Sequence, residues 1–231
     1  MDSEAAQRVF AVDAVAFDLD GTLLDTVHDL AASVNLLLAE QALPALGVDV
    51  VRDLIGRGIN DLLTRALTRA RGTPPRDGEV AGLLPSYQRS YASILGTHTR
   101  LYPGVLQGLQ RMRDAGYGLA VITNKSTRFV QPHLVHAGIA EFFTVVIGGD
   151  DAVSKKPDAA PVLMAARRLG VAPARMLMVG DSVNDVGAAR AAGSPVLVVP
   201  YGYNEGVPVQ KLAADGIVDS LEAVADLLSR E

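Results

Sequence analysis

Short runs of apolar residues alternate with longer segments of helical periodicity along most of the chain. The apolar runs are brief and rich in Val, Leu and Ile, as buried strands are, and they cover residues 14–17, 119–123, 143–149, 175–180 and 195–200. Helical stretches lie between the later runs and end near a glycine, at residues 104–115, 126–137, 159–169 and 184–192. This alternation predicts an α/β fold with a doubly wound, Rossmann-like parallel sheet.

One interval, from about residue 26 to residue 98, contains helical patterns and no convincing strand. A connection at residues 71–78, "RGTPPRDG", divides these patterns. We therefore expect a helical cap domain at residues 25–98, inserted into an α/β core domain formed by residues 1–24 and 99–231. A unit joined by two linkers is suited to closing over a site and excluding water.

Composition narrows the class of protein. The 231 residues are 49% hydrophobic and 20% charged, which is ordinary for a globular protein, and the net charge of −5 argues against non-specific nucleic-acid binding. The chain has no cysteine, so disulfides and thiolate chemistry are excluded. The polar start "MDSEAAQR" is unlike a secretion signal, and no apolar run approaches the ~18 residues of a membrane helix. We expect a cytoplasmic monomer or homodimer that binds no membrane.

Polar side chains follow three of the predicted strands. Asp18 and Asp20 follow the first, Thr123 and Asn124 follow the second, and Asp181 follows the fourth, with Ser182 and Asp185 close behind. In an open parallel sheet, ligands bind beyond the carboxyl ends of the strands. We therefore expect these residues to gather at one edge of the sheet.

Several carboxylates at one site repel one another unless a cation is present. Oxygen ligands without His or Cys favour a hard ion, Mg²⁺ before Ca²⁺ or Zn²⁺, and Mg²⁺ is commonly completed by water and a substrate phosphate. Asp18, at the end of its strand, is placed to attack phosphorus and form an aspartyl-phosphate. Asp20 is placed to protonate the leaving oxygen and later to deprotonate water.

Donors for the phosphoryl oxygens are also present. Gly21 permits a sharp turn that aims backbone N–H groups at phosphate, Thr123 and Asn124 offer hydrogen bonds, and a lysine of "SKKPD" offers charge. Each motif alone is also typical of a turn or a helix cap, and "GDSVND" is typical of a strand-to-helix turn with Ser or Asp as N-cap. The order of all four motifs after successive strands favours the functional interpretation.

The stretches "DLDGTLLDT", "TN", "KPD" and "GDSVNDVGAARAAG" resemble the four motifs of the haloacid dehalogenase superfamily, phosphatase branch. The resemblance implies a doubly wound core with a helical cap. It further implies that Asp18 is the nucleophile and that Asp20 is the general acid and base, with its backbone carbonyl on Mg²⁺. Lys156, which precedes Pro157, and Thr123 would hold the phosphoryl group, with Asp181 binding Mg²⁺. Asp185, with Ser182 beside it, would act around the ligands through water or by orienting the lysine.

The motifs leave several reactions open. A dehalogenase lacks the second aspartate, so Asp20 argues against one, whereas a phosphosugar mutase of the β-phosphoglucomutase type shares Asp20 and this type of cap. "VPYGYNEGVP" and "IGRGINDLL" are similar to segments of the phosphoglycolate phosphatase branch, and in the latter Arg57 or nearby backbone N–H groups would meet a substrate carboxylate. The best prediction is therefore hydrolysis of 2-phosphoglycolate, a small phosphorylated metabolite. A pyrophosphatase or nucleotidase, and a non-catalytic protein that binds a phosphometabolite, are the alternatives.

Two pairs of side chains invite a functional interpretation that we do not favour. His133 and His136 lie three residues apart on a predicted helix, but no third metal ligand is evident, so we expect a packing or surface role. Tyr87 and Tyr91 lie four residues apart and are expected to pack the cap.

Overall fold

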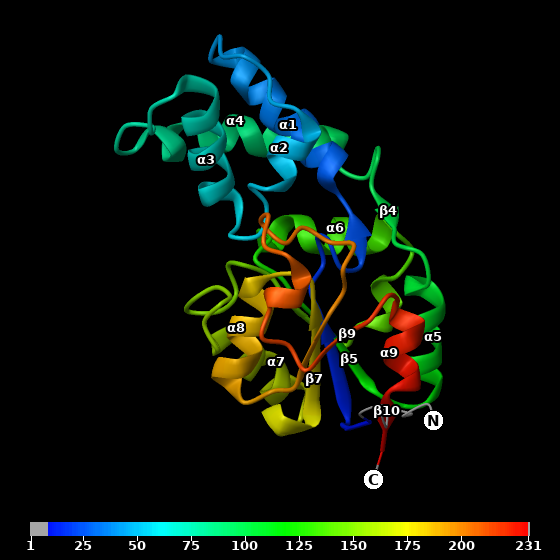
Figure 1. Cartoon of the computed structure of the whole chain (residues 1–231). Coiled ribbons are helices and arrows are strands. Elements are labelled where there is room, and N and C mark those ends of the chain that lie inside the picture. Colours follow the sequence, from blue (N-terminus) through cyan, green and yellow to red (C-terminus); the bar gives the residue numbers. More distant parts are fainter. Residues whose placement is uncertain (1–8, 231) are drawn as a thin grey trace, which may run out of the picture.

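A six-stranded sheet forms the centre of the larger part of the molecule (Figure 1), in a computed structural model that describes residues 9–230. The polar segment 1–8, on which the expectation about secretion rests, lies outside the described residues. The strands are Ala14–Phe17 (β2), Gly118–Ile122 (β5), Val145–Ile147 (β6), Met176–Gly180 (β7), Val196–Val198 (β8) and Gly216–Ile217 (β9). They lie in the order β6-β5-β2-β7-β8-β9, and all neighbours are parallel.

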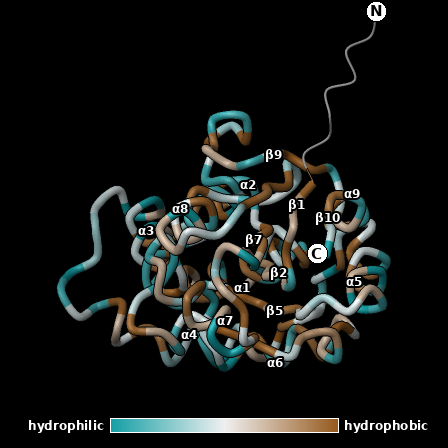
Figure 2. Tube along the Cα trace, turned by 90° about the horizontal axis from the view of Figure 1, so that it is seen from below, coloured by the Kyte–Doolittle hydropathy of each residue, from teal (hydrophilic) through white to brown (hydrophobic). Residues whose placement is uncertain are grey.

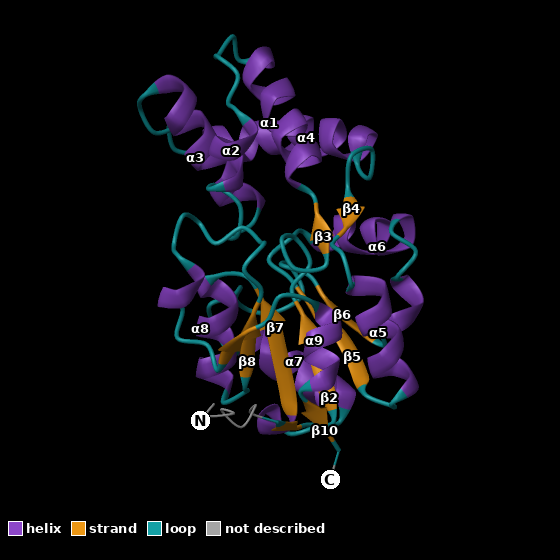
Figure 3. Ribbon diagram, turned by 45° about the vertical axis from the view of Figure 1, so that its right-hand side comes forward, coloured by secondary structure: helices purple, strands orange, loops and turns teal. Residues whose placement is uncertain are grey.

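Alternate residues of each strand enter two separate hydrophobic cores, one on either face of the sheet. Val15 and Phe17 pack on one face and Ala14 and Ala16 on the other. The first core is covered by Val105–Asp114 (α5), Thr127–His136 (α6) and Leu221–Asp226 (α9), and the second by Ala160–Leu169 (α7) and Val183–Ala192 (α8). Helices on both faces confirm the predicted doubly wound α/β fold (Figure 3). Figure 2 shows the hydrophobic strands at the centre of this part.

Four further helices stand together beyond the carboxyl end of the sheet (Figures 1 and 3). They are Val27–Glu40 (α1), Val48–Arg52 (α2), Ile59–Arg71 (α3) and Glu79–Ile94 (α4). Their apolar faces bury a third hydrophobic cluster, which Phe129 and Tyr203 enter from outside the helical unit. The helical unit therefore has a core of its own, which Phe129 and Tyr203 connect to the rest of the molecule.

The chain crosses between the two parts at a small antiparallel pair of strands, Leu24–Asp25 (β3) and Arg100–Leu101 (β4). The buried carboxylate of Asp29 ties the second crossing to α1, because it accepts hydrogen bonds from the backbone N–H groups of Gly96 and His98 and from Thr99 Oγ1. The expected domain boundaries at 24/25 and 98/99 fall inside β3 and just before β4. We retain this division as a proposal.

The predicted strands and helices agree with the structure to within about two residues at each end, and the elements that were missed are short. They include the edge strand β9, the helix α2, and the parallel pair Phe10–Ala11 (β1) and Leu228–Ser229 (β10). Three single 3₁₀ turns occur at Ala140–Phe142 (η1), Pro173–Arg175 (η2) and Val209–Lys211 (η3). Pieces this short show no periodicity in a sequence. Among residues 9–230, no helix has the length and apolar character needed to span a membrane.

Candidate active site

Three strands of the sheet end side by side, and a polar residue follows each of them. Asp18 follows β2, Thr123 follows β5 and Asp181 follows β7. The parallel register aligns the last residue of β2 with Val121 on one side and with Val179 on the other. The structure therefore brings these three segments, far apart in the sequence, to one edge of the sheet beneath the helical unit.

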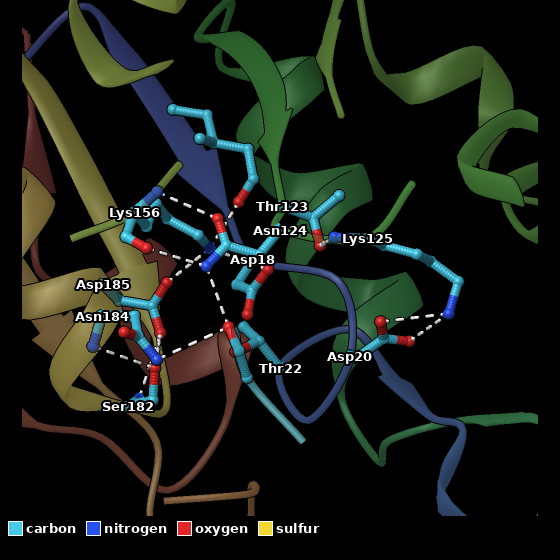
Figure 4. A network of polar contacts seen from close by, with 12 residues as sticks. Asp18, Asp20, Thr22, Thr123, Asn124, Lys125, Lys156, Ser182, Asn184 and Asp185 are labelled. Carbon is cyan, nitrogen blue, oxygen red and sulfur yellow. Dashed lines mark hydrogen bonds and ion pairs between the residues drawn. The ribbon is translucent and has the colours of Figure 1, made fainter. Parts of the chain in front are cut away.

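Lys156 lies between Asp18 and Asp185 and is almost fully buried (Figure 4). Its Nζ is 2.9 Å from Asp18 Oδ1 and 2.6 Å from Asp185 Oδ1, and it donates to the carbonyl oxygen of Ile122 at 2.7 Å. Burial alone would lower the pKa of Lys156, but the two carboxylates outweigh burial and raise it above its ordinary value. Lys156 therefore holds a positive charge directly beside Asp18.

The carboxyl groups of Asp18 and Asp181 lie in surroundings that disfavour ionisation of both. Burial raises the pKa of Asp18 to about 6, with Lys156 opposing and Asp185 adding to the rise. Burial, then Asp185 and Asp18, raise the pKa of Asp181 well above its ordinary value. One oxygen from each of these three aspartates lies within 4.8 Å of the others. Three carboxylates against one lysine leave an excess of negative charge, and oxygen donors of this kind fit Mg²⁺.

The carboxylate of Asp181 is held by two hydrogen-bond donors, and Gly21 packs closely against it. Its oxygens accept from Thr22 Oγ1 at 2.8 Å and from the backbone N–H of Tyr203 at 2.5 Å. Gly21 has a φ of +91°, and a Cβ built on it would lie 2.5 Å from Asp181 Oδ2. The N–H of Gly21 itself donates to the carbonyl of Leu24. Gly21 thus makes room for Asp181, and its own amide is not directed at a phosphate.

Asp185 is occupied at both oxygens. Its Oδ1 meets Lys156, while its Oδ2 accepts from the backbone N–H groups of Asp181 and Ser182 and from Ser182 Oγ. Ser182 is the N-cap of α8 and forms a capping box with Asp185. A carboxylate with this many donors is better suited to orienting Lys156 than to binding a metal directly.

The side chain of Asp20 points away from the three clustered aspartates (Figure 4). Its oxygens lie 2.9 and 3.1 Å from Lys125 Nζ, and Oδ1 accepts from Thr26 Oγ1 at 2.7 Å. Burial is the largest influence and acts to raise the pKa of Asp20, but the Lys125 ammonium, His133 and the Thr26 hydrogen bond together outweigh it and hold the pKa below its usual value. The Asp20 carboxylate is thus separated from the three clustered aspartates and is paired with a cation of its own.

Thr123 and Asn124 differ in what they offer a phosphoryl group. Thr123 lines the cavity, and its Oγ1 accepts only a 3.2 Å hydrogen bond from the N–H of Lys125, so its own hydrogen is available to a ligand. The Asn124 amide donates to the carbonyls of Gly56 and Lys156, and its Oδ1 accepts from the N–H of Lys156. The expected contact from the Asn124 side chain to phosphate is therefore replaced by a role in holding the lysine loop.

Arg57 is not placed where a substrate carboxylate was expected to meet it. Its guanidinium is about half exposed and lies 2.9 Å from Glu205, a residue of the "YGYNEG" segment. Glu205 also lies 3.5 Å from Arg65 and accepts a 2.9 Å hydrogen bond from Asn184. Arg57 thus belongs to a contact between the helical unit and the sheet, while the neighbouring Gly56 and Gly58 do line the cavity.

A cavity of about 60 Å³ lies between this edge of the sheet and the helical unit. The helical unit contributes mainly apolar side chains, Leu30, Ile55, Ile59, Leu62, Tyr87 and Tyr91. The sheet contributes Asp18, Asp20, Thr123, Asn124, Lys125, Ser126 and Phe129. The cavity is therefore small, acidic and hydrogen-bonding at its floor, and largely apolar at its roof.

Sequence reasoning missed Lys125, the partner of Asp20. The motif "TNKS" places this lysine at the same edge of the sheet as Thr123 and Asn124, because it follows them directly after a strand. The sequence does not show in which direction the Lys125 side chain points. Tyr87 and Tyr91 pack in the helical unit as expected. His133 is fully buried, as a packing residue is, and His136 lies at the surface.

Comparisons with known proteins agree with this geometry. Residues 15–199 match the family model described as haloacid dehalogenase-like hydrolase. The chain is 44% identical to a phosphoglycolate phosphatase of Nitrosospira multiformis, covering 95% of this chain and 96% of that one. It is 42% identical to a phosphoglycolate phosphatase of Escherichia coli K12, covering 90% and 88%. A crystal structure of a predicted phosphoglycolate phosphatase from Haemophilus somnus aligns with a TM-score of 0.88 and 35% identity, covering 93% and 97%.

Proposed function

The chain belongs to the haloacid dehalogenase-like hydrolase family, and on that premise we propose that it is a Mg²⁺-dependent phosphatase that hydrolyses 2-phosphoglycolate to glycolate and phosphate. The observation that carries this proposal is the placement of Asp18, which lines a small cavity, beside Lys156 and Asp181. The phosphoglycolate phosphatases among its relatives, similar over most of their length, support the choice of substrate. In this proposal residues 25–98 form the cap that excludes water.

The carboxylates of Asp18 and Asp181 and the backbone carbonyl of Asp20 would hold the metal, while Asp185 would orient Lys156. When bound, Mg²⁺ neutralises the charge of the carboxylates and of the phosphoryl oxygens. The excess of buried carboxylates over lysine at this edge supports this assignment.

Asp18 begins the reaction as the nucleophile. One of its carboxylate oxygens forms a bond to phosphorus, and the bond between phosphorus and the ester oxygen breaks. The electron pair goes to the ester oxygen, which leaves as glycolate after taking a proton from Asp20. Lys156 and the hydroxyl of Thr123 stabilise the negative charge on the phosphoryl oxygens during this transfer.

Asp20 then acts as a base. It removes a proton from a water molecule, the water oxygen attacks phosphorus, and the bond to Asp18 breaks with its electron pair returning to the carboxylate. The Lys125 ammonium beside Asp20 favours the ionised form that this second step needs. Phosphate is released and both aspartates return to their starting states.

The cavity favours a phosphatase for small substrates over a sugar mutase. Four of the six roof side chains, Leu30, Ile55, Ile59 and Leu62, offer no hydrogen bonds to sugar hydroxyls, and the other two are the tyrosines Tyr87 and Tyr91. A non-catalytic binding role is disfavoured because Asp18, which such a role would not require, is held beside a buried lysine.

Phosphate release from 2-phosphoglycolate tests the proposal directly. We expect turnover that depends on Mg²⁺, is abolished by EDTA and is restored by excess Mg²⁺. Asp18→Asn should retain the fold, measured by its melting temperature, and should lose turnover by several orders of magnitude. Incubation with glucose 1-phosphate should yield little phosphate and no isomer. Native turnover by Asp18→Asn, or preferred conversion of glucose 1-phosphate to an isomer, would contradict the proposal.

A further inference from the structure

One charged donor, Lys125, projects into the cavity from among the described residues that line it. Lys156 is enclosed by Asp18, Asp185 and a backbone carbonyl, and it is not part of the lining. The two other cations near the entrance, Arg57 and Lys155, also lie outside the lining. A substrate that carries a second anionic group beyond its phosphoryl group would therefore meet Lys125.

Lys125 is held in place by a chain of hydrogen bonds that ends in the interior. Its Nζ donates to Tyr91 Oη at 2.7 Å, and Tyr91 Oη lies 3.4 Å from His133 Nε2. His133 Nδ1 lies 2.9 Å from the carbonyl of Phe129 and can only donate there, so Nε2 is the acceptor for the tyrosine hydroxyl. Each group in this series of hydrogen bonds therefore donates to the next. Tyr91 donates to His133, and its hydroxyl oxygen accepts from Lys125.

This series of hydrogen bonds joins the two parts of the molecule. Tyr91 belongs to α4 of the helical unit, whereas Lys125 and His133 belong to the sheet side. The Lys125 side chain is only 5% exposed, and its Nζ lies over the Tyr91 ring at 5.0 Å from the ring centre. The ammonium is therefore desolvated and oriented before any ligand arrives.

The ammonium retains capacity for another acceptor. One of its three N–H groups meets Tyr91, and the two oxygens of Asp20 at 2.9 and 3.1 Å can share a second. A third N–H then remains for another acceptor, and Lys125 is one of the residues that line the cavity. An uncapped helix start adds to the attraction, because α3 begins at the cavity-lining Ile59 after Gly58, with no side chain capping it.

We propose that Lys125 binds a carboxylate of the substrate. The site would then select small phosphomonoesters that carry a carboxylate over esters of the same size that lack this charged group. The proposal rests on the phosphatase function proposed above and names the residue that sets its substrate class. It replaces Arg57, which the structure pairs with Glu205, as the specificity-determining cation. The competing interpretation is that Lys125 only positions Asp20.

A comparison of two isosteric substrates separates these interpretations. We would measure kcat/KM of the wild type and Lys125→Met for 2-phosphoglycolate and for its uncharged amide, 2-phosphoglycolamide. Loss of a charge-assisted contact should lower the preference for the carboxylate by roughly 10- to 100-fold. If Lys125 only positions Asp20, its replacement would lower the two kcat/KM values by the same factor. An unchanged ratio of these values in Lys125→Met would therefore overturn the proposal.

Two matched variants control for a general loss of positive charge near the entrance. Arg57→Met and Lys155→Met each remove one cation that does not line the cavity. Both should keep the wild-type ratio of the two kcat/KM values. A loss of preference in these variants equal to that of Lys125→Met would also overturn the assignment.

Binding provides a second measurement, which stands even if Lys125→Met has no turnover. 3-Phosphonopropionate and its amide mimic the two substrates and cannot be hydrolysed, so their Kd values with Mg²⁺ can be measured by calorimetry on folded protein. Wild type should bind the carboxylate at least about tenfold more tightly, and Lys125→Met should lose this preference. If wild type fails to hydrolyse 2-phosphoglycolate, the proposed function fails. If it succeeds and the preference survives Lys125→Met, only the present inference fails.

Discussion

The hydroxyl of Tyr203 donates to the carboxylate of Asp25 at 2.6 Å, at the point where the chain leaves the sheet for α1. The same oxygen accepts from the backbone N–H groups of Thr26 and Val27 at 2.7 and 3.0 Å, and the backbone N–H of Tyr203 donates to Asp181. One residue thus provides hydrogen bonds to the start of α1 and to a carboxylate of the candidate metal site. The tyrosine-containing segment singled out in the sequence therefore acts as a structural link between them.

Replacement of Tyr203 by Phe should destabilise the protein. The change leaves the buried N–H of Thr26 without an acceptor and the N–H of Val27 with only a 3.4 Å hydrogen bond to Asp25 Oδ1, which costs about 2 kcal/mol. For a chain of this size the melting temperature should fall by roughly 4–8 °C. Tyr201→Phe is the control, because the Tyr201 hydroxyl makes one 3.1 Å hydrogen bond, to the carbonyl of Thr22. Equal melting temperatures for the two variants would contradict the linking role.

Replacement of Gly21 by Ala should impair activity beyond its effect on backbone strain. The new Cβ would meet Asp181 Oδ2 at 2.5 Å and would displace that carboxylate. Gly138→Ala is a matched control, because Gly138 also has a positive φ, +70°, but has no atom within 4 Å of a built Cβ. We expect both variants to lose about 1–2 kcal/mol of stability from the left-handed backbone. Only Gly21→Ala should also raise the Mg²⁺ concentration that gives half-maximal activity, measured by titration.

The contribution of Asp20 should depend on the leaving group. Asp20→Asn cannot supply a proton, so kcat for 2-phosphoglycolate should fall by about 10²- to 10⁴-fold. The loss should be much smaller for 4-nitrophenyl phosphate, whose leaving group needs no proton, provided that its first step limits the rate. Single-turnover measurement of nitrophenolate release isolates that step. The same loss on both substrates would show that Asp20 acts through the structure of the site and not as an acid.

His133 should make the folded state less stable in mild acid. Burial, followed by the nearby Lys125 charge, lowers the pKa of His133 from its usual 6.5 to about 4. Between these two values the unfolded chain binds more protons than the folded protein, so the free energy of unfolding falls as pH falls from about 6.5 towards 4. The loss has an upper bound of about 3 kcal/mol.

Denaturant titrations of wild type and His133→Gln between pH 7 and pH 4.5 measure this contribution. The variant should show a shallower loss of unfolding free energy with falling pH, whatever its stability at pH 7. His28→Gln removes an exposed imidazole and serves as the control. Parallel pH profiles for wild type and His133→Gln would refute the assignment of the acid sensitivity to His133.

The strands that build the floor of the site were predictable because each is buried on both faces. Residues 14–17 and 176–180 are apolar without interruption, and the structure places every one of them in the interior. The position of Asp18 and Asp181 at one edge follows from parallel topology, since carboxyl ends of parallel strands share an edge. The edge strand β9 was not predictable, because two residues carry no periodic pattern.

Side-chain direction set the limit of prediction at the site itself. Asn124 and Lys125 are neighbours after the same strand, yet the first turns back to hold the loop of Lys156 and the second reaches Asp20. Arg57 carries the charge expected at the cavity, but Glu205, 148 residues away in the sequence, holds it outside. Neither choice is encoded in local spacing, because it depends on which partners the folded chain brings within reach.

The amino-acid pattern alone predicts the sheet, the helical insertion and the set of acidic and hydroxyl residues at the strand ends, because periodic burial and strand polarity are properties of the local chain. The folded structure was needed to show which cation meets Asp20, which carboxylates enclose Lys156 and which residue joins the helical unit to the candidate metal site. Those pairings are contacts between segments far apart in sequence, and their strength depends on distance and burial in three dimensions.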